Sequence, residues 1–418
     1  MPLHRVEQRA RENAVSRSPE DGQMSRWSAP MMERRDLLRA SAIWTAASYS
    51  RVFGANERIR IAGLGVGGRA TYLLGLAARA ENTEIVAVCD VSETRRLAAK
   101  EKFSPGGKEY LDYREVLGRN DIDGVVIGAP DHWHVPMTVD AVRAGKDVYV
   151  EKPISHTIEE GERVEKAVLN SKQIVQVGYQ QRSWPHFLQA RGIVAEGKLG
   201  KISLVLTSWY QDYVVDQTLP QLDASKIDWK RFLGSAPDQP FDALRCARWR
   251  WFWDFGGGHL TDLYSHYGDV VQWYMEQYAP STAQATGNRN ALPQFECPDT
   301  INAAWEYPGF TMAYNGALNG SLDGGNILFR GHRATMKLNR DGFAVYPEGK
   351  VQRELTHWPE PEIAVKSPAD GTVAHMQNFL DCVRSRNAPN ASIRPAVAIA
   401  RAAHLANTAW RKGTVWSA

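Results

Sequence analysis

The sequence predicts two architectures in one chain: an α/β half built on a doubly wound parallel sheet, followed by an α+β half built on a mainly antiparallel, open sheet. Three observations predict this division. A glycine-rich turn joins a strand to a helix near residue 63, short apolar strands then alternate with helices to residue 178, and longer extended runs follow. We therefore expect a leader at residues 1–55, a first domain at 56–178 and a second domain at 179–418.

The composition is that of an ordinary globular protein, with 43% hydrophobic and 23% charged residues in a chain of 418. Lysine and arginine together number 50, against 47 aspartates and glutamates, which leaves a net charge of only +3. A chain with this balance has no field to hold a polyanion, so we do not expect nucleic acid as a partner. The cysteines show no paired spacing, which argues against a disulfide scaffold and a cysteine-rich zinc site.

The expected leader contains the pair Arg34-Arg35, followed by a modest apolar run at residues 40–47. A twin-arginine pair before a weakly hydrophobic segment resembles a Tat export signal, which predicts a periplasmic or otherwise exported protein. The run is far shorter than the roughly 20 residues that span a bilayer, so we expect no stable membrane insertion. The alternative is an amphipathic N-terminal helix that happens to contain two arginines, in a cytoplasmic protein.

The first domain opens on a strand at residues 58–62 that leads directly into Gly63, Gly65, Gly67 and Gly68, and a helix follows to residue 80. The glycines fit G-x-G-x-x-G in its strand–turn–helix context. In this motif we expect the first glycine to make the turn, the second to let the backbone approach a pyrophosphate, and the third to allow close helix–strand packing. The pattern predicts a Rossmann domain that binds a dinucleotide at the helix N-terminus.

A second strand, at residues 84–89, ends at Asp90, which lies 22 residues after Gly68. This is close to the spacing of roughly 20 expected for the acid that binds a ribose 2′-hydroxyl. Because its carboxylate would repel a 2′-phosphate, NAD is favoured over NADP. Arg95 and Arg96 lie just beyond and could accommodate that phosphate instead, so NADP stays possible.

Further strands at residues 123–128, 147–151 and 174–177 alternate with helices, which completes a doubly wound sheet. Ligands of such sheets bind at the carboxyl ends of the strands. Residues that directly follow a strand are therefore expected to face the cofactor, and they include Pro130, Asp131, His132, His134, Glu151, Lys152 and Tyr179.

The second domain has extended runs at residues 201–210, 302–314 and 325–345, the last broken by turn residues, and an alanine-rich helix at 393–411. Such runs suggest a largely antiparallel sheet. An open sheet face is often buried in an oligomer, so a homodimer or homotetramer is expected.

The densest cluster of chemically active side chains lies in residues 249–266. A helix is expected to begin near His259, which would place Asp262 and His266 on one face. An aspartate beside a histidine can orient the ring and make it a competent base. Two other interpretations stay open: a helix-capping acid beside a half-buried histidine, and a metal held by His259, Asp262 and His266. We expect no metal.

The glycine motif, the run Glu151-Lys152-Pro153 and the Asp262-x-x-x-His266 spacing together resemble the Gfo/Idh/MocA family of oxidoreductases, which includes glucose–fructose oxidoreductase and inositol dehydrogenase. The resemblance extends from Asn56 to the C-terminus and implies hydride transfer between NAD(P) and a secondary alcohol of a sugar or polyol. It implies a nicotinamide over the sheet edge, with Lys152, Asp262 and His266 around the substrate carbon. Exported, Tat-type members are known in that family.

The chemistry of alcohol oxidation gives these residues separate roles. His266, held by Asp262, is expected to take the hydroxyl proton, and Lys152 to stabilise the developing alkoxide. Four further residues are expected near the substrate, although Arg182 could instead form an interdomain salt bridge and Trp251 could instead pack in the core. They are Tyr179, Arg182, His259 and Trp251.

Two other functions remain open at this point. In a redox-neutral glycosidase or lyase, a tightly bound NAD would oxidise a ring hydroxyl, elimination would follow, and the cofactor would be restored. A nicotinamide-binding sensor without turnover is disfavoured by the presence of Lys152, Asp262 and His266. Net release of NADH would distinguish a dehydrogenase from the redox-neutral enzyme. Export of the protein would favour the redox-neutral reaction, because free NAD is scarce outside the cytoplasm.

Overall fold

A computed structural model describes residues 58–214, 218, 221–349 and 358–418. The expected leader at residues 1–55 lies outside these described residues.

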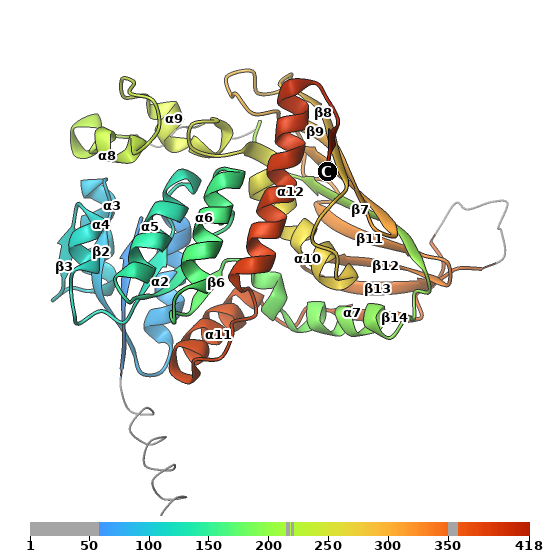
Figure 1. The fold of residues 1–418 in the computed structure, drawn as a ribbon, viewed down its shortest axis with the longest axis horizontal. Coiled ribbons are helices and arrows are strands. Elements are labelled where there is room, and N and C mark those ends of the chain that lie inside the picture. The colour runs from blue at the N-terminus through green and yellow to red at the C-terminus, as the bar shows by residue number, and fades with distance from the viewer. Residues whose placement is uncertain (1–57, 215–217, 219–220, 350–357) are drawn as a thin grey trace, which may run out of the picture. The chain divides into compact units, whose positions relative to one another are not determined.

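The N-terminal sheet has six parallel strands in the order β3-β2-β1-β4-β5-β6 (Figure 1). Its central strands are buried along their whole length on both faces, as in Gly124–Ile127, which is why they read as continuous apolar runs. The strands are β1 (Ile59–Leu64), β2 (Thr83–Cys89), β3 (Lys108–Tyr110), β4 (Gly124–Ile127), β5 (Asp147–Val150) and β6 (Val175–Val177).

Helices cover both faces of this sheet, which confirms the predicted doubly wound architecture. Side chains of α2, α3 and α11 pack on one face, and side chains of α4, α5 and α6 pack on the other. α11 comes from the far end of the chain but completes this layer. The helices are α2 (Gly68–Arg79), α3 (Glu93–Phe103), α4 (Tyr113–Leu117), α5 (Asp131–Arg143), α6 (Ile158–Leu169) and α11 (Gly371–Ser385).

Local capping fixes where helices begin near the carboxyl edge of the sheet. The Thr157 side chain accepts the N–H of Glu160, while the Glu160 carboxylate accepts the N–H of His156 at 3.1 Å. This pair resembles a capping box, with the N–H of His156 in place of that of the N-cap Thr157, and it starts α6 soon after the segment that follows β5. The Glu151-Lys152-Pro153 segment is therefore held between a buried strand and a capped helix.

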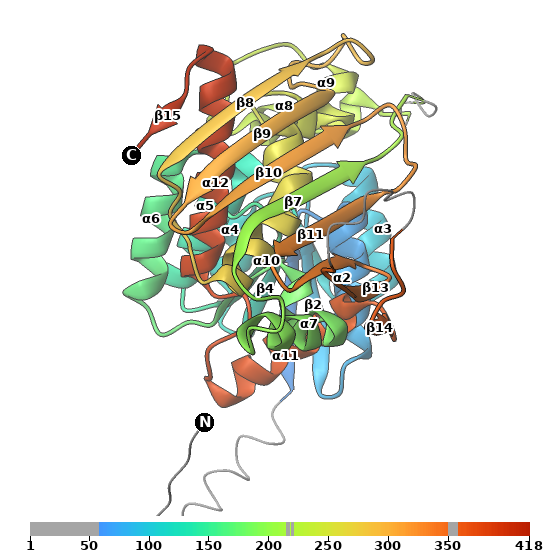
Figure 2. The same cartoon turned by 90° about the vertical axis from the view of Figure 1, so that its right-hand side faces the viewer.

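The C-terminal sheet has nine strands in the order β14-β13-β12-β11-β7-β10-β9-β8-β15 (Figure 2). Only the β7–β10 pair is parallel among these described strands, so the prediction of a mainly antiparallel sheet is confirmed. The strands are β7 (Ile202–Tyr210), β8 (Thr282–Asn288), β9 (Thr300–Tyr307), β10 (Phe310–Ala317), β11 (Gly325–Gly331), β12 (Ala334–Asn339), β13 (Gly342–Pro347), β14 (Ile363–Lys366) and β15 (Trp416–Ser417).

The extended run expected at residues 302–314 is two strands rather than one. Pro308 and Gly309 form the turn between β9 and β10, and Gly309 has a φ of +92°, a conformation that favours glycine. Likewise, the run at residues 325–345 is divided among β11, β12 and β13. The turn residues indicated the breaks in the second run, whereas the β9–β10 hairpin was not expected because both of its arms have strand composition.

One face of the C-terminal sheet packs on α10 (Ser265–Met275) and α12 (Ile393–Lys412), and the predicted C-terminal helix is thereby confirmed. Trp305 ties the layers together: its indole stacks on Tyr264 at 4.3 Å and donates to the carbonyl of Ala402 at 2.9 Å. No helix in the described part of the chain is both long and apolar enough to cross a membrane. The remaining helices are η1 (Gln180–Ser183), α7 (Pro185–Ala195), η2 (Ala224–Lys226), α8 (Trp229–Leu233), α9 (Ala243–Ala247), η3 (Trp249–Trp251) and the π-helix η4 (Leu260–Tyr264).

Candidate active site

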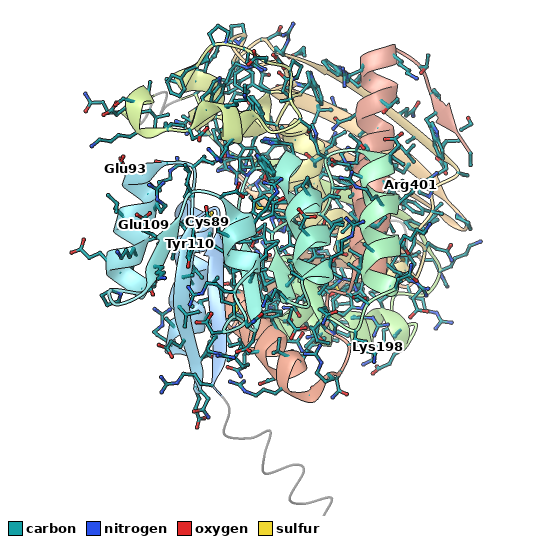
Figure 3. The ribbon with its side chains drawn as sticks, turned by 60° about the vertical axis from the view of Figure 1, so that its left-hand side comes forward. Cys89, Glu93, Glu109, Tyr110, Lys198 and Arg401 are labelled. Carbon is teal, nitrogen blue, oxygen red and sulfur yellow. The ribbon has the colours of Figure 1, made fainter. Side chains whose placement is uncertain are left out.

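A cavity of about 320 Å³ lies at the carboxyl edge of the N-terminal sheet, against the glycine-rich turn. The N-terminus of α2 opens into it, so free backbone N–H groups and the positive end of the helix dipole face the space. Figure 3 labels Cys89 and Tyr110, the last residues of β2 and β3, at this edge. The lining combines residues after β1, β2 and β4, among them Gly65, Gly67, Gly68, Asp90, Ala129 and Pro130.

The glycines of the motif have different roles from those expected. Gly65 makes the turn, with a φ of +74°, and a Cβ on it would lie 2.5 Å from the backbone nitrogen of Ala129. Gly63, not Gly68, allows the close helix–strand contact, because its Cβ would lie 2.6 Å from Leu74 of α2. A Cβ on Gly67 or Gly68 would meet nothing within 4 Å. The assignment by position in the motif was therefore wrong for Gly63 and Gly68.

Asp90 lies in the wall of this cavity, where the sequence placed it. Its carboxylate accepts the N–H groups of Val66 and Ser92, both at 2.8 Å, which ties the end of β2 to the glycine turn. Burial raises its pKa, although the charge of Arg95 and these N–H groups act against that rise. Arg95 lines the cavity, whereas Arg96 pairs with Glu109 and donates to the Asp90 carbonyl at 3.0 Å.

The second domain supplies the opposite wall of the cavity. Arg231 and Phe232 come from α8, and Ala247, Trp249 and Arg250 come from α9 and the residues after it. The His132 ring and the Trp133 indole both meet the carbonyl of Phe232, at 2.8 and 2.9 Å, which fastens this segment to α5.

These residues fit a nicotinamide dinucleotide. Gly67 and Gly68 leave the space beside the α2 N-terminus empty of side chains, which a pyrophosphate needs. Asp90 provides a carboxylate at the cavity wall, and the Glu151-Lys152-Pro153 segment begins where β5 ends in the same sheet.

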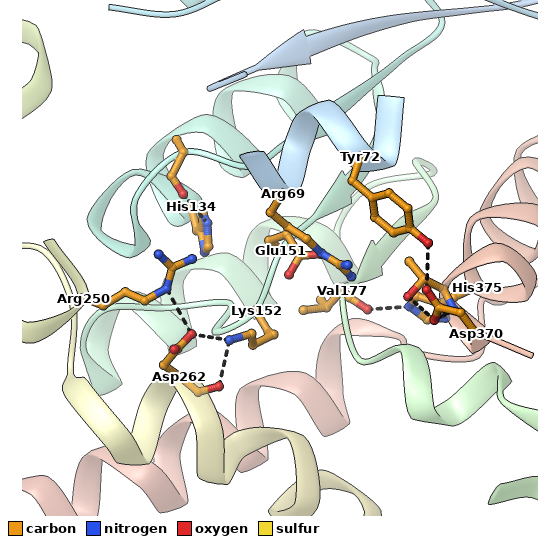
Figure 4. A network of polar contacts seen from close by, with 12 residues as sticks. Arg69, Tyr72, His134, Glu151, Lys152, Val177, Arg250, Asp262, Asp370 and His375 are labelled. Carbon is orange, nitrogen blue, oxygen red and sulfur yellow. Dashed lines mark hydrogen bonds and ion pairs between the residues drawn. The ribbon is translucent and has the colours of Figure 1, made fainter. Parts of the chain in front are cut away.

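Lys152 and Asp262 join the two domains at the centre of the candidate site (Figure 4). The Lys152 ammonium donates to the Asp262 carboxylate at 2.5 Å and to its backbone carbonyl at 2.7 Å. From another side, the Arg250 guanidinium donates to the same carboxylate at 3.2 Å. Burial alone would raise the pKa of Asp262, but Lys152 and Arg250 outweigh it and hold that pKa at about 2. The Lys152 side chain is thus fixed as a buried hydrogen-bond donor.

His266 lies close to this cluster but is not held by Asp262, so the expected Asp262–His266 pair is wrong. Among the described residues, its Nδ1 has no hydrogen-bond partner, and its ring stacks on Trp209 at 5.8 Å. Asp262 belongs to the π-helical turn η4 and His266 to the α-helix that follows, which shifts the register within the helix. Burial, followed by the charge of Lys152, lowers the pKa of His266 well below its ordinary value.

A second pair of charges supports the site from the α2 side. The Arg69 guanidinium donates to the Glu151 carboxylate at 2.9 Å. Gly178 makes room for this carboxylate, since a Cβ there would lie 2.8 Å from a Glu151 oxygen. Glu151 is therefore placed beneath the glycine turn, at the cofactor edge predicted for it.

Asp131 begins α5 and is buried, with 3% of its surface exposed. Burial raises its pKa well above the ordinary value, against the opposing charge of Arg250. Asp131 is therefore a buried acid close to the charge of Arg250.

His134 does not turn its ring toward the cavity, contrary to expectation. Its two ring nitrogens lie 2.6 Å from the carbonyl of Pro153 and 2.8 Å from that of Ala129. The ring therefore ties the loop after β4 to the segment after β5. His134 supports the site, while the neighbouring Pro130 lines the cavity itself.

Arg182 and Tyr179 are buried rather than presented to a substrate. Arg182 forms three hydrogen bonds of 2.8 to 3.1 Å with the fully buried Asp269, and its guanidinium lies 5.2 Å from the ring centre of Trp273. Arg182 thus forms a buried salt bridge, but with Asp269 of the same expected domain and not across the two domains. Tyr179 is fully buried and packs edge-on against His266 at 6.5 Å, behind the candidate site.

Trp251 and His259 also lie in the interior. Trp251 is 1% exposed and stacks on Phe295 at 5.9 Å, so the core interpretation holds and a sugar-binding face is wrong. The Nδ1 of His259 lies 2.7 Å from the hydroxyl of Tyr314, and burial lowers the pKa of His259 to about 3. No group of three or more His, Cys, Asp or Glu side chains in the described ranges could hold a metal ion.

Sequence reasoning assigned no role to Arg69, Arg250 or Arg340, which the structure places around Lys152 and His266. Arg69 directly follows the glycine motif and Arg250 lies within the segment singled out at residues 249–266, so position gave a signal for both. Arg340 lies in a hairpin between β12 and β13, and nothing in its sequence context points to a site.

Two family models match the chain. One, described as an oxidoreductase family with an NAD-binding Rossmann fold, covers residues 58–179. The other, described as the C-terminal alpha/beta domain of the same oxidoreductase family, covers residues 200–414. Both carry the name Gfo/Idh/MocA.

Individual proteins are similar to the chain in sequence or in structure. Inositol 2-dehydrogenase of Salmonella paratyphi B is 34% identical over 41% of this chain and 53% of its own length. Glycosyl hydrolase family 109 protein 2 of Shewanella sp. strain ANA-3 is 32% identical over 31% and 35%. The chain thus spans about half the length of the first of these relatives, and less of the second. The crystal structure of the WlbA dehydrogenase from Bordetella pertussis, in complex with NADH and UDP-GlcNAcA, superposes with a TM-score of 0.66, at 20% identity, over 87% of this chain and 99% of that one.

Proposed function

The chain belongs to the Gfo/Idh/MocA oxidoreductase family, and on that premise we propose that it moves a hydride between a nicotinamide cofactor and a secondary alcohol of a sugar or polyol. The observation that carries the proposal is the buried Lys152 ammonium, fixed by Asp262 where the two domains meet. A fixed cation at this place can stabilise negative charge that develops on a substrate oxygen. The bound nicotinamide would supply the hydride acceptor.

The side chains divide the remaining work. Lys152 donates a hydrogen bond to the reacting oxygen, and Asp262, which also accepts a hydrogen bond from Arg250, keeps Lys152 in place. His266 takes the hydroxyl proton, because burial keeps its ring neutral and its Nδ1 has no described partner. Asp262 therefore acts on Lys152 rather than on the histidine.

The test is the absorbance of reduced nicotinamide with added NAD or NADP and pooled sugars, polyols and glycosides. A rise in absorbance with an alcohol substrate supports the proposal. Unchanged absorbance with every pool, from protein that binds NADH, would contradict it.

The pH dependence of kcat/KM tests the role of His266. An ordinary histidine has a pKa of about 6.5, and half of such a base would be lost at that pH. Because the pKa of His266 is lowered, its neutral form persists below pH 6.5, and activity should fall only as the pH passes below the lowered value. We expect kcat/KM to be level from pH 8 to about pH 6. An acid limb with its midpoint at or above pH 6.5 would exclude His266 as the base.

For cofactor choice, we propose NAD over NADP. The Asp90 carboxylate in the cavity wall would repel a 2′-phosphate. Of the two arginines that could bind that phosphate, only Arg95 lines the cavity, because Arg96 is bonded to the Asp90 carbonyl. We expect kcat/KM for NAD to exceed that for NADP by about 10-fold, which corresponds to roughly 1.4 kcal/mol. Arg95→Ala should weaken use of NADP more than use of NAD. Equal use of both cofactors by the wild type would contradict the assignment.

A redox-neutral glycosidase is the second candidate, and the partial similarity to a glycosyl hydrolase family 109 protein favours it. Such an enzyme would retain its NAD. Heat-denatured, gel-filtered protein would then release NAD in proportion to its concentration, and a glycoside would be cleaved without net change in absorbance. Net NADH formation in proportion to product would exclude this candidate.

Two proposals concern the protein in its surroundings. The outer face of the C-terminal sheet keeps Leu206 and Leu328, which are direct neighbours across two strands, only half-buried. This supports a homodimer or homotetramer through that face, which light scattering after gel filtration would detect.

The Arg34-Arg35 pair supports export, and replacing both arginines by lysine should leave the protein in the cytoplasm of fractionated cells.

A further inference from the structure

Arg340 is a cation beside the candidate site that has no acidic partner among the described residues. It lies in the turn between β12 and β13, and its guanidinium stacks on Trp209 at 4.9 Å from the ring centre. Its Nε is buried and has no hydrogen-bond partner among the described residues. A buried donor without a partner costs free energy unless something else satisfies it.

The other shielded arginines of the described chain all have acids. Arg69 pairs with Glu151, Arg182 with Asp269 and Arg250 with Asp262. Burial accordingly lowers the pKa of Arg340. In contrast, the acidic partners of Arg69, Arg182 and Arg250 raise the pKa of each of these arginines.

The acids nearest to Arg340 are already engaged. Asp370 accepts the hydroxyl of Tyr72 at 2.7 Å and both the N–H and the hydroxyl of Thr372. Glu151 is engaged by Arg69. The neighbouring Asp341 is exposed to solvent. Asp341 thus lies in solvent, and no carboxylate in the described part of the chain forms an ion pair with Arg340.

Arg340 is connected to the catalytic cluster through stacked rings. Trp209 carries the guanidinium and lies nearly parallel to the His266 ring, with an interplanar angle of 22°. The charge of Arg340 reaches His266, as does that of Lys152. A substrate whose hydroxyl meets Lys152 and His266 would therefore lie within the field of this guanidinium.

We propose that Arg340 binds an anionic group of the substrate, so that the enzyme acts on an acidic sugar rather than a neutral one. This inference rests on the proposed function for the site in which the substrate lies. A guanidinium can hold a carboxylate or a phosphate through two parallel N–H bonds. Arg340 is then a specificity-determining residue.

The test measures binding by titration calorimetry of the full chain, with and without saturating NADH. The probes are matched pairs that differ in charge: D-glucuronate and D-glucose, D-galacturonate and D-galactose, with D-glucose 6-phosphate to separate a carboxylate from a phosphate. We expect at least one acidic probe to bind at least 10-fold more tightly than its neutral partner. Arg340→Met should remove that preference and change neutral-sugar binding by less than 3-fold, and Arg340→Lys should keep part of it.

Arg330→Met is the matched control, because Arg330 of β11 also lies over a tryptophan ring, at 5.5 Å from the ring centre of Trp358. It should leave the preference for acids intact. The melting temperature of Arg340→Met should be no lower than that of the wild type, since the substitution removes a charge that has no acidic partner among the described residues. An unchanged melting temperature would show that the variant is folded.

Two results would overturn the inference: no acidic probe binding more tightly than its neutral partner, or Arg340→Met weakening both members of a pair equally. Failure of the proposed function is seen separately. Acid binding that depends on Arg340, without any reduction of NAD by the bound probe, would reject the redox activity and leave the anion site standing.

Discussion

Replacing Lys152 by methionine is expected to lower kcat by about 10²–10³-fold, the range seen when one donor to a developing oxyanion is removed. The affinity for NAD should stay within a few-fold, because the cavity beside the glycine turn does not depend on this side chain. The variant should fold, since the Asp262 carboxylate keeps its hydrogen bond from Arg250. Steady-state rates and NADH binding by fluorescence measure the two quantities.

Lys146 offers a matched control at the other end of the same strand, β5. It precedes β5 where Lys152 follows it, and its buried ammonium donates to the carbonyls of Arg119 and Ile122 at 2.6 and 2.9 Å. Lys146→Met should lower the melting temperature and leave kcat unchanged. If Lys152→Met kept wild-type kcat, or if both variants lost activity equally, the catalytic role assigned to Lys152 would be wrong.

Lys152 could be found from the sequence because a parallel sheet brings the ends of its strands to one edge. Once the strand at residues 147–151 was identified, its C-terminal neighbours had to face the ligand. The same reasoning placed Asp90 and Pro130 in the cavity wall, where the structure has them. These predictions needed only local patterns and one topological rule.

The pairing of Asp262 could not be found in this way. Helical spacing suggested His266 as its partner, but Lys152, 110 residues earlier, takes the carboxylate instead. The choice depends on how the second domain docks on the first and on the π-helical turn, neither of which a regular period encodes. Arg340 shows the same limit, because a hairpin turn carries it to His266 without any motif.

The buried residues were misjudged for a related reason. Trp251 and Arg182 belong to types that often bind sugars or anions, and residue type alone does not report burial. For Arg182 the decisive partner is Asp269, which is 87 residues away and fully buried. An acid and a base that satisfy each other in the interior have no capacity left for a ligand.

Replacing Arg182 by methionine is accordingly expected to destabilise the protein by about 3–5 kcal/mol, the cost of leaving one member of a buried ion pair alone. Asp269 would then remain buried in α10 without the three hydrogen bonds that Arg182 donates to it. The stacking of the guanidinium near Trp273 would be lost as well. Urea unfolding followed by tryptophan fluorescence measures the loss.

The double variant Arg182→Met/Asp269→Leu distinguishes an ion pair from a substrate contact. Replacing both charges by apolar groups removes the stranded carboxylate, so the double variant should recover most of the lost stability. Below the unfolding transition, KM and kcat of both variants should lie within about 3-fold of the wild type, because neither residue touches the substrate. A large rise in KM in the fully folded double variant would instead return Arg182 to the substrate site. Recovery of stability with unchanged KM would show that Arg182 has a structural role. Its ion pair with Asp269 then holds α10 against the segment that follows β6, behind Tyr179 and His266.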